Sequence, residues 1–183
     1  VVKIVKILVI QLLKYRIKRK ILNISLSLFS VGIISYFYIK KNMTFDKEAM
    51  IARCNAFSKN TLMETLGMEF TDAGPDYLVA TMPVNSTVHQ PMGLLHGGAS
   101  VALAESVGSA ASMLYVNPEN NEVRGIEISA NHLRSKRKGM VTGTARIIHK
   151  GTTIHLWEIR ITDEDDRLVS LCKLTNIILP RKK

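Results

Sequence analysis

The feature that most constrains the fold is a segment at residues 98–115 with small or apolar residues on nearly every helical face. Its sequence, GASVALAESVGSAASMLY, carries a single charged side chain, Glu105. A helix that is apolar on all sides is normally buried. The sequence therefore predicts a long central helix that other elements surround, with many Ala, Ser and Gly residues that allow the surrounding backbone to approach closely.

The segments on either side of this helix predict one sheet around it. A helical pattern over residues 44–60 precedes two expected strands, 66–72 and 77–84, which a turn joins into a hairpin. Apolar residues alternate with period two in four later segments, 123–134, 140–149, 152–162 and 168–179. A sheet that curls around one helix satisfies this order, so we expect a two-layer α+β domain. Its free edge would be covered by edge-to-edge pairing in a dimer.

The charge distribution excludes one class of function. Nine of the 25 Lys and Arg residues lie in residues 1–42, which contain no Asp or Glu, and this leaves 16 basic and 15 acidic residues in 43–183. The main body of the chain is therefore nearly neutral. It offers no basic field for phosphate backbones, so we expect no nucleic-acid partner.

The first 42 residues are set apart from the domain that we expect at 43–183. Residues 21–39 are uncharged and could just cross a bilayer, with the basic flank favouring a cytoplasmic N-terminus. Residues 1–42 also lack Met, and an ordinary polar sequence begins at Met43, which favours a start site assigned too far upstream. A membrane anchor and an export signal remain as alternatives. We expect a cytoplasmic protein, with membrane association only if residues 1–42 are genuine.

The two cysteines, Cys54 and Cys172, lie far apart and form no CxxC pattern. This indicates free thiols in a reducing compartment. Neither the Cys nor the His and Asp residues show the spacing of metal ligands, so we expect no metal and no bound cofactor.

Glu105 is the only ionisable residue in the predicted central helix. Burying an unpaired carboxylate is costly, so such a residue usually has a partner or a function. We expect a carboxylate in a partly apolar cleft that acts as nucleophile or general base. The alternative is a structural residue that faces solvent.

Gly97 and Gly98 stand at the start of the same helix, where free N–H groups and the positive end of the helix dipole converge. Without Cβ atoms, a substrate carbonyl could approach this backbone and form an oxyanion site. The alternative is a tight turn into the helix. Gln90 and His96 flank the loop that leads into the helix, and Ser109 follows Glu105 by four residues on the same face.

Residues 89–106, HQPMGLLHGGASVALAES, resemble the signature of hotdog-fold acyl-CoA thioesterases of the phenylacetate-degradation type. Within that family they are most similar to the group that hydrolyses 1,4-dihydroxy-2-naphthoyl-CoA and aryl-CoA. Residues 130–135, ANHLRS, form a second matching block. The resemblance implies a curved antiparallel sheet wrapped around a central helix. It also implies homodimers that assemble as homotetramers, with active sites at the dimer interface.

The resemblance also implies roles for individual residues. Glu105 would be the catalytic carboxylate, and the Gly97 N–H would polarise the thioester carbonyl. Gln90 and His96 would orient the thioester and its leaving group. Four residues are expected on the substrate-binding side: Gly98, Ser109, His132 and Arg134. The basic run from Arg134 to Lys138 could meet the CoA phosphates, although a solvated loop is the plainer interpretation.

The predicted function is hydrolysis of an aromatic acyl-CoA, such as a naphthoyl or benzoyl thioester, to free acid and CoA. Menaquinone biosynthesis is the expected pathway. The sequence does not separate attack by Glu105, through a mixed anhydride, from activation of water. Two alternatives from other classes are a non-catalytic acyl-CoA-binding module and a 3-hydroxyacyl dehydratase. The acyl pocket is expected to involve Met68, Met92, Leu94 and Met113.

Overall fold

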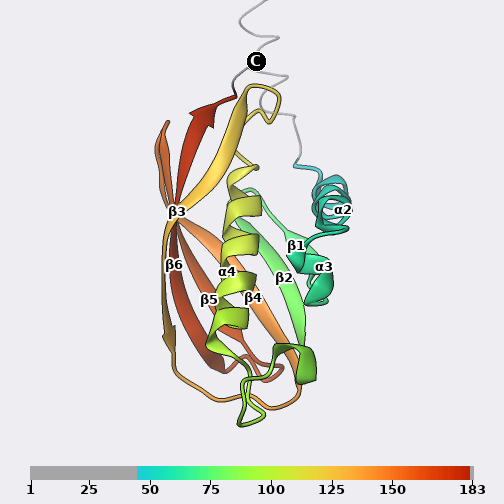
Figure 1. Ribbon diagram of the computed structural model, residues 1–183. Coiled ribbons are helices and arrows are strands. Elements are labelled where there is room, and N and C mark those ends of the chain that lie inside the picture. Colours follow the sequence, from blue (N-terminus) through green and yellow to red (C-terminus); the bar gives the residue numbers. More distant parts are fainter. Residues whose placement is uncertain (1–44, 182–183) are drawn as a thin grey trace, which may run out of the picture. The chain divides into compact units, whose positions relative to one another are not determined.

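Six antiparallel strands form one sheet that curves around a single long helix (Figure 1). The computed structural model describes residues 45–181, and the apolar run at 21–39 lies outside them. The strand order across the sheet is β1-β2-β4-β5-β6-β3. The predicted α+β architecture is therefore confirmed. Among the described residues, no helix combines the length and the apolar character needed to cross a membrane.

The elements follow one another in the predicted order. They are α2 (Lys47–Ser58), α3 (Leu62–Thr65), β1 (Glu69–Ala73), β2 (Tyr77–Val84), a 3-10 turn η1 (Ser86–Val88), α4 (Gly97–Ser112), β3 (Asn121–His132), β4 (Gly139–Lys150), β5 (Ile154–Thr162) and β6 (Leu168–Pro180). Only α3 and η1 were not expected. Each spans a single turn, which is too short for a hydrophobic period to show.

The concave face of the sheet packs closely against α4 because the helix carries small residues. A Cβ atom on Gly108 would lie 2.7 Å from a methyl group of Leu174 on β6, so only glycine permits this approach. Ser112 lies at the end of the helix, where its hydroxyl accepts hydrogen bonds from Trp157 Nε1 at 2.9 Å and Asn176 Nδ2 at 2.8 Å. These contacts fix α4 against β5 and β6.

One side of α4 is not covered by the sheet. The sheet ends at β3, whose residues are mostly exposed, and Ile126 on this strand is 56% exposed. The opposite edge, β1, packs against α2. The long edge strand β3 is therefore the free edge that the sequence predicted, and an exposed edge of this kind is a template for pairing with another chain.

Candidate active site

Gly97 presents a free backbone amide at the N-terminus of α4. His96 is the N-cap of the helix, and its Nδ1 accepts a hydrogen bond from the Gly98 N–H at 2.8 Å. The Gly98 amide is therefore already used. The Gly97 N–H donates to no acceptor within residues 45–181, so it is the donor that remains for a substrate oxygen.

His132 lies directly beside this amide. A Cβ atom on Gly97 would lie 2.6 Å from His132 Nε2, which shows how closely the imidazole approaches the helix start. The other ring nitrogen, Nδ1, is 2.6 Å from the hydroxyl of Ser170, a fully buried residue opposite His132 in the pairing of β3 and β6. Ser170 thus holds the imidazole in place against Gly97.

A cavity of about 160 Å³ brings most of the predicted helix-tip residues together. Its lining consists of Gln90, Leu95, Gly97, Ser100, His132, Arg134 and Val169. Four of the eight site residues expected from the sequence therefore share one small cavity at the N-terminus of α4. The remaining four are divided between the helix cap, His96 and Gly98, and the middle of the helix, Glu105 and Ser109.

The loop before α4 leaves the amide nitrogen of Gln90 available. The Met92 N–H donates to Gln90 Oε1, which identifies the oxygen of this side chain. The backbone N–H of Gln90 donates to Leu94 O at 2.8 Å, and Gly93 completes the turn with a φ of 70°. Because the oxygen is engaged within the loop, the NH₂ group of Gln90 is the part that can bind a ligand.

The segment between β3 and β4 holds this loop. Leu95 N–H donates to Lys136 O at 2.7 Å, and His89 Nε2 donates to Arg137 O at 2.8 Å. Arg137 in turn donates to Met92 O at 3.2 Å. Three hydrogen bonds therefore fix the position of the loop that carries Gln90.

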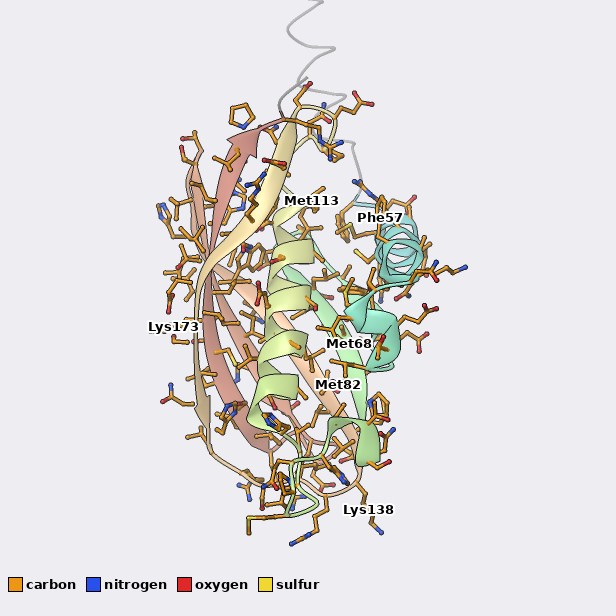
Figure 2. The ribbon with its side chains drawn as sticks, viewed as in Figure 1. Phe57, Met68, Met82, Met113, Lys138 and Lys173 are labelled. Carbon is orange, nitrogen blue, oxygen red and sulfur yellow. The ribbon has the colours of Figure 1, made fainter. Side chains whose placement is uncertain are left out.

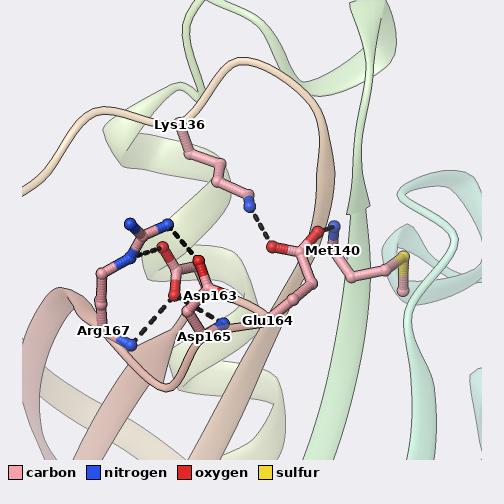
Figure 3. A network of polar contacts seen from close by, with 6 residues as sticks. All are labelled: Lys136, Met140, Asp163, Glu164, Asp165 and Arg167. Carbon is pink, nitrogen blue, oxygen red and sulfur yellow. Dashed lines mark hydrogen bonds and ion pairs between the residues drawn. The ribbon is translucent and has the colours of Figure 1, made fainter.

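That segment is itself anchored by a polar network at the turn between β5 and β6 (Figure 3). Glu164 pairs with Lys136 and accepts a hydrogen bond from the Met140 N–H at 2.7 Å. These two donors lower the pKa of the Glu164 carboxyl to about 2. Asp163, which is buried, orders the turn by accepting from Arg167 Nε at 2.9 Å.

The network also refines the prediction for the basic run. Lys136 is engaged with Glu164 inside the chain. Arg134, Arg137 and Lys138 are exposed, and Arg134 lines the small cavity beside Gly97. Within the basic run, Arg134, Arg137 and Lys138 are therefore the side chains available to meet an anionic ligand.

Glu105 occupies a different environment from the one that we expected. Glu105 is exposed in the single chain. Its Oε1 lies 2.9 Å from the position that a Cβ atom on Gly125 of β3 would take. The carboxylate therefore lies against the backbone of the free edge strand. The expectation of a partly buried cleft is not met within one chain, because the sheet ends at β3 and leaves this side of α4 open.

Glu105 and Gly97 do not meet within one chain. They are eight residues apart on one helix, which separates them by about 12 Å along its axis. One thioester carbonyl could not contact both groups of the same helix. Within one chain the predicted site residues therefore form two separate groups, called here the helix-tip half-site and the Glu105 half-site of the candidate site.

Ser109 belongs to the half-site of Glu105, as its spacing predicted. Its hydroxyl is 3.4 Å from Asn176 Oδ1, and it borders a larger cavity of about 450 Å³ between α2, α4 and β3. Met113 lines this cavity, as expected for an acyl pocket. Met68 packs in the core and does not line this cavity, and Met92 is 73% exposed on the loop before α4, so their part in an acyl pocket stays a prediction.

Two sets of residues that lie next to the predicted site residues were not predicted from the sequence. Ser170 reaches His132 only through the register of β3 and β6, which no local spacing reveals. The residues of α2 that line the larger cavity gave no motif signal. Within residues 45–181, no group of three or more His, Cys, Asp or Glu side chains is arranged to hold a metal ion.

Comparison with known proteins identifies the family. The family described as the Thioesterase superfamily matches residues 92–170. The 1,4-dihydroxy-2-naphthoyl-CoA hydrolase of Escherichia coli is 44% identical over 137 residues, covering 75% of this chain and 100% of that protein. The proofreading thioesterase EntH of Cronobacter turicensis is 43% identical over 137 residues, covering 75% of this chain and 99% of that protein.

Solved structures agree with the sequence relatives. The crystal structure of a mutant thioesterase from Pseudomonas aeruginosa superposes with a TM-score of 0.71 at 44% identity, covering 76% of this chain and 98% of that chain. A thioesterase from Haemophilus influenzae has a TM-score of 0.69 at 40% identity, covering 75% of this chain and 92% of that chain. The chain therefore belongs to the thioesterase superfamily, has the hotdog fold, and is a thioester hydrolase.

Proposed function

We propose that this protein hydrolyses aromatic acyl-CoA thioesters, of the 1,4-dihydroxy-2-naphthoyl-CoA or benzoyl-CoA kind, to the free acid and CoA. The observation that carries the proposal is the free Gly97 N–H, which shares a small cavity with Gln90, His132 and Arg134. A relative with the name of a naphthoyl-CoA hydrolase supports the aromatic class and a role in menaquinone biosynthesis.

The active site in this proposal is built by two copies of the chain. Glu105 and the free edge of β3 are exposed on the same side of the single chain, and Gly97 is about 12 Å away on the same helix. Antiparallel pairing of two β3 strands around a two-fold axis would set the two α4 helices side by side in opposite directions. The tip of one helix would then approach Glu105 of the other.

The helix-tip half-site would bind and polarise the thioester. Its carbonyl oxygen accepts a hydrogen bond from the Gly97 N–H, an interaction worth roughly 3 kcal/mol to the transition state in comparable oxyanion sites. The free NH₂ of Gln90 can donate to the same thioester. In its neutral form the His96 ring carries its proton on Nε2, because Nδ1 accepts from Gly98, so it can donate to the departing sulfur.

Glu105 of the second copy would supply the reactive carboxylate. In one route its oxygen attacks the carbonyl carbon, CoA leaves as the thiolate, and water then cleaves the mixed anhydride. In the other route it takes a proton from the water that attacks the carbonyl. The Ser109 hydroxyl, on the same face of α4, can hold that water in either route. Both routes give the free acid and CoA.

The central experiment replaces Glu105 in the full-length chain. Glu105→Ala and Glu105→Gln are assayed against 1,4-dihydroxy-2-naphthoyl-CoA and benzoyl-CoA by detection of the free thiol. We expect turnover to fall by about a hundredfold or more, in keeping with loss of an acid-base or nucleophilic group. Undiminished turnover in either variant would refute the role of Glu105. Tight binding without thiol release, or an unsaturated product from 3-hydroxyacyl-CoA, would instead favour the binding module or the dehydratase.

Three expectations from the sequence stay predictions within this proposal. The first is assembly as a homodimer and homotetramer, which native mass spectrometry measures. The second is contact of the CoA phosphates with Arg134, Arg137 and Lys138, which charge-removing variants would reveal as a higher KM. The third is a cytoplasmic protein whose domain begins at residue 43, which fractionation and intact mass of the native protein would test.

A further inference from the structure

We propose that α2 forms the outer wall of the acyl-binding chamber, and that Cys54 and Phe57 on this wall select bulky, mainly apolar acyl groups. This inference rests on the proposed thioesterase function and specifies the substrate class of the same site. No sequence motif predicted a role for α2, and the proposal is based on the residues that line the larger cavity.

The chamber begins within one helical turn of the proposed catalytic carboxylate, Glu105, which does not itself line it. The stripe of α4 that lines the 450 Å³ cavity consists of Ser106, Ser109, Ala110 and Met113. Ser109 lies four residues after Glu105 on the same helical face, so it connects the carboxylate to this lining. Small-molecule pockets typically measure about 300–1,000 Å³, so this cavity is large enough for the group attached to a carbonyl at Glu105.

The facing wall is a matching stripe of α2, formed by Met50, Arg53, Cys54 and Phe57. Cys54 is only 7% exposed, and burial raises the pKa of its thiol to about 11, so at neutral pH it is an uncharged wall group. Phe57 lines the cavity while 69% exposed, which places it at the rim. Figure 2 shows Phe57 on α2 and Met113 beyond the end of α4 on the two sides of this space.

The rim also carries a positive charge. The Arg53 guanidinium lies 5.6 Å from the centre of the Phe57 ring, a cation–π contact that covers one face of the ring. The pair leaves an apolar surface with a cationic border at the mouth of the chamber. An aromatic acyl group can stack on such a surface and bring its hydroxyl groups near the guanidinium.

Hydrogen bonds hold α2 against β1. The Asn55 side chain bonds the backbone of Phe70 twice, accepting from its N–H at 2.8 Å and donating to its carbonyl at 2.9 Å. These are the two bonds that a neighbouring strand would make to β1. Ser58 Oγ also donates to Cys54 O at 3.0 Å, which secures the last turn of α2. The width of the chamber is therefore set by the side chains on α2.

The lining identifies the class of acyl group. Nine of the fifteen lining residues are Met, Phe, Ala, Cys, Val or Pro, and the hydroxyls of Ser106 and Ser109 lie on the α4 side. The remaining four lining residues are Arg53, Asn121, Glu122 and Arg181. A short acyl group would leave this apolar surface in contact with water, which is unfavourable. A ring system with few hydroxyl groups fills the chamber, and the flexible Met side chains adapt to its outline.

The test narrows the chamber from the α2 side. Cys54→Phe places a ring in the wall, and Ala56→Phe adds the same ring two residues later, at an exposed position that does not line the cavity. For the full-length variants, kcat/KM is measured with 1,4-dihydroxy-2-naphthoyl-CoA, benzoyl-CoA and butyryl-CoA. We expect Cys54→Phe to lower the ratio of naphthoyl to butyryl activity by at least about tenfold, because pocket misfits discriminate on this scale. Ala56→Phe should leave the ratio within about twofold.

A second variant keeps the proposal testable if Cys54→Phe fails to fold. Phe57→Ala removes an exposed rim side chain, so the fold should persist, and we expect the ratio of naphthoyl to benzoyl activity to change by about threefold or more. If Cys54→Phe and Phe57→Ala both fold and both keep the wild-type activity ratios, the proposal is refuted. If Cys54→Phe does not fold, an unchanged ratio of naphthoyl to benzoyl activity in Phe57→Ala refutes it. A wild-type protein that releases no thiol from any of the esters would instead refute the proposed function.

Discussion

A methyl group at position 97 tests the geometry of the helix tip most directly. In Gly97→Ala the new Cβ would lie 2.6 Å from His132 Nε2, 2.9 Å from Cδ2 and 3.2 Å from Cε1. The first two distances are shorter than carbon and nitrogen atoms tolerate, so the imidazole must move. It can do so only by breaking the 2.6 Å contact between its Nδ1 and the buried Ser170 hydroxyl.

The effects on stability and on activity should differ widely. Losing one hydrogen bond costs about 1 kcal/mol, and alanine is favoured over glycine in a helix by up to about 1 kcal/mol, so the two nearly cancel. The catalytic effect is larger, because the displaced ring and the methyl group both disturb the carbonyl at the Gly97 amide. Losing an oxyanion contact of about 3 kcal/mol lowers kcat by roughly a hundredfold.

Thermal unfolding and thiol release from the naphthoyl ester measure the two effects. The matched control is Gly98→Ala, whose Cβ would meet the exposed His96 ring at 3.1 Å, a contact that a small movement relieves. We expect this control to lose only a few-fold in activity. In a His132→Ala background, Gly97→Ala should cost much less than in the wild type. A Gly97→Ala protein within threefold of wild-type kcat would refute this reasoning.

Three further predictions concern other parts of the structure. Glu164→Gln removes the partner of Lys136, so kcat should fall several-fold, while Asp165→Asn in the same turn should leave kcat unchanged. Because the pKa of Glu164 is lowered from 4.5 to about 2, the stability that its carboxylate contributes is complete above pH 4.5 and is lost toward pH 2. The free energy of unfolding of Glu164→Gln should therefore fall less steeply than that of the wild type between these two pH values. Burial lowers the pKa of His155 below 6.5, so the unfolded chain binds a proton first as pH falls through 6.5 and stability declines; His155→Phe should reduce this decline in denaturant titrations at several pH values. Mixing inactive Glu105→Ala and Gln90→Ala chains should restore about a quarter of wild-type activity, because half of the dimers are then heterodimers with one of two sites intact. A mixture no more active than either variant alone would contradict a site shared by two copies.

The fold was predictable because its signals are local. The alternation of apolar and polar residues predicted the ends of each long strand to within a few residues. The small residues of α4 predicted close packing against the sheet, and the structure has Gly108 against Leu174. The helix tip was predictable for a related reason, since Gln90, His96 and Gly97 lie within eight positions of one another.

The site was less predictable where it depends on register. Ser170 reaches His132 because β3 and β6 pair at that point, and Asn55 reaches Phe70 across fifteen positions of sequence. The exposure of Glu105 follows from where the sheet ends, which strand order determines and composition does not. These are long-range outcomes of topology, so no spacing within the sequence could reveal them.

The two groups that we propose to take part in the reaction, the Gly97 amide and the Glu105 carboxylate, lie on one unbroken helix, and this restricts which insertions the chain can accept. Their separation is set by backbone geometry and cannot be adjusted by side-chain rotation. One residue inserted between Gly97 and Glu105 would turn the carboxylate by about 100° around the helix axis, to the position that Ser106 now holds beside the larger cavity. A change of length in this interval would therefore separate the two groups from the geometry that the proposed reaction needs.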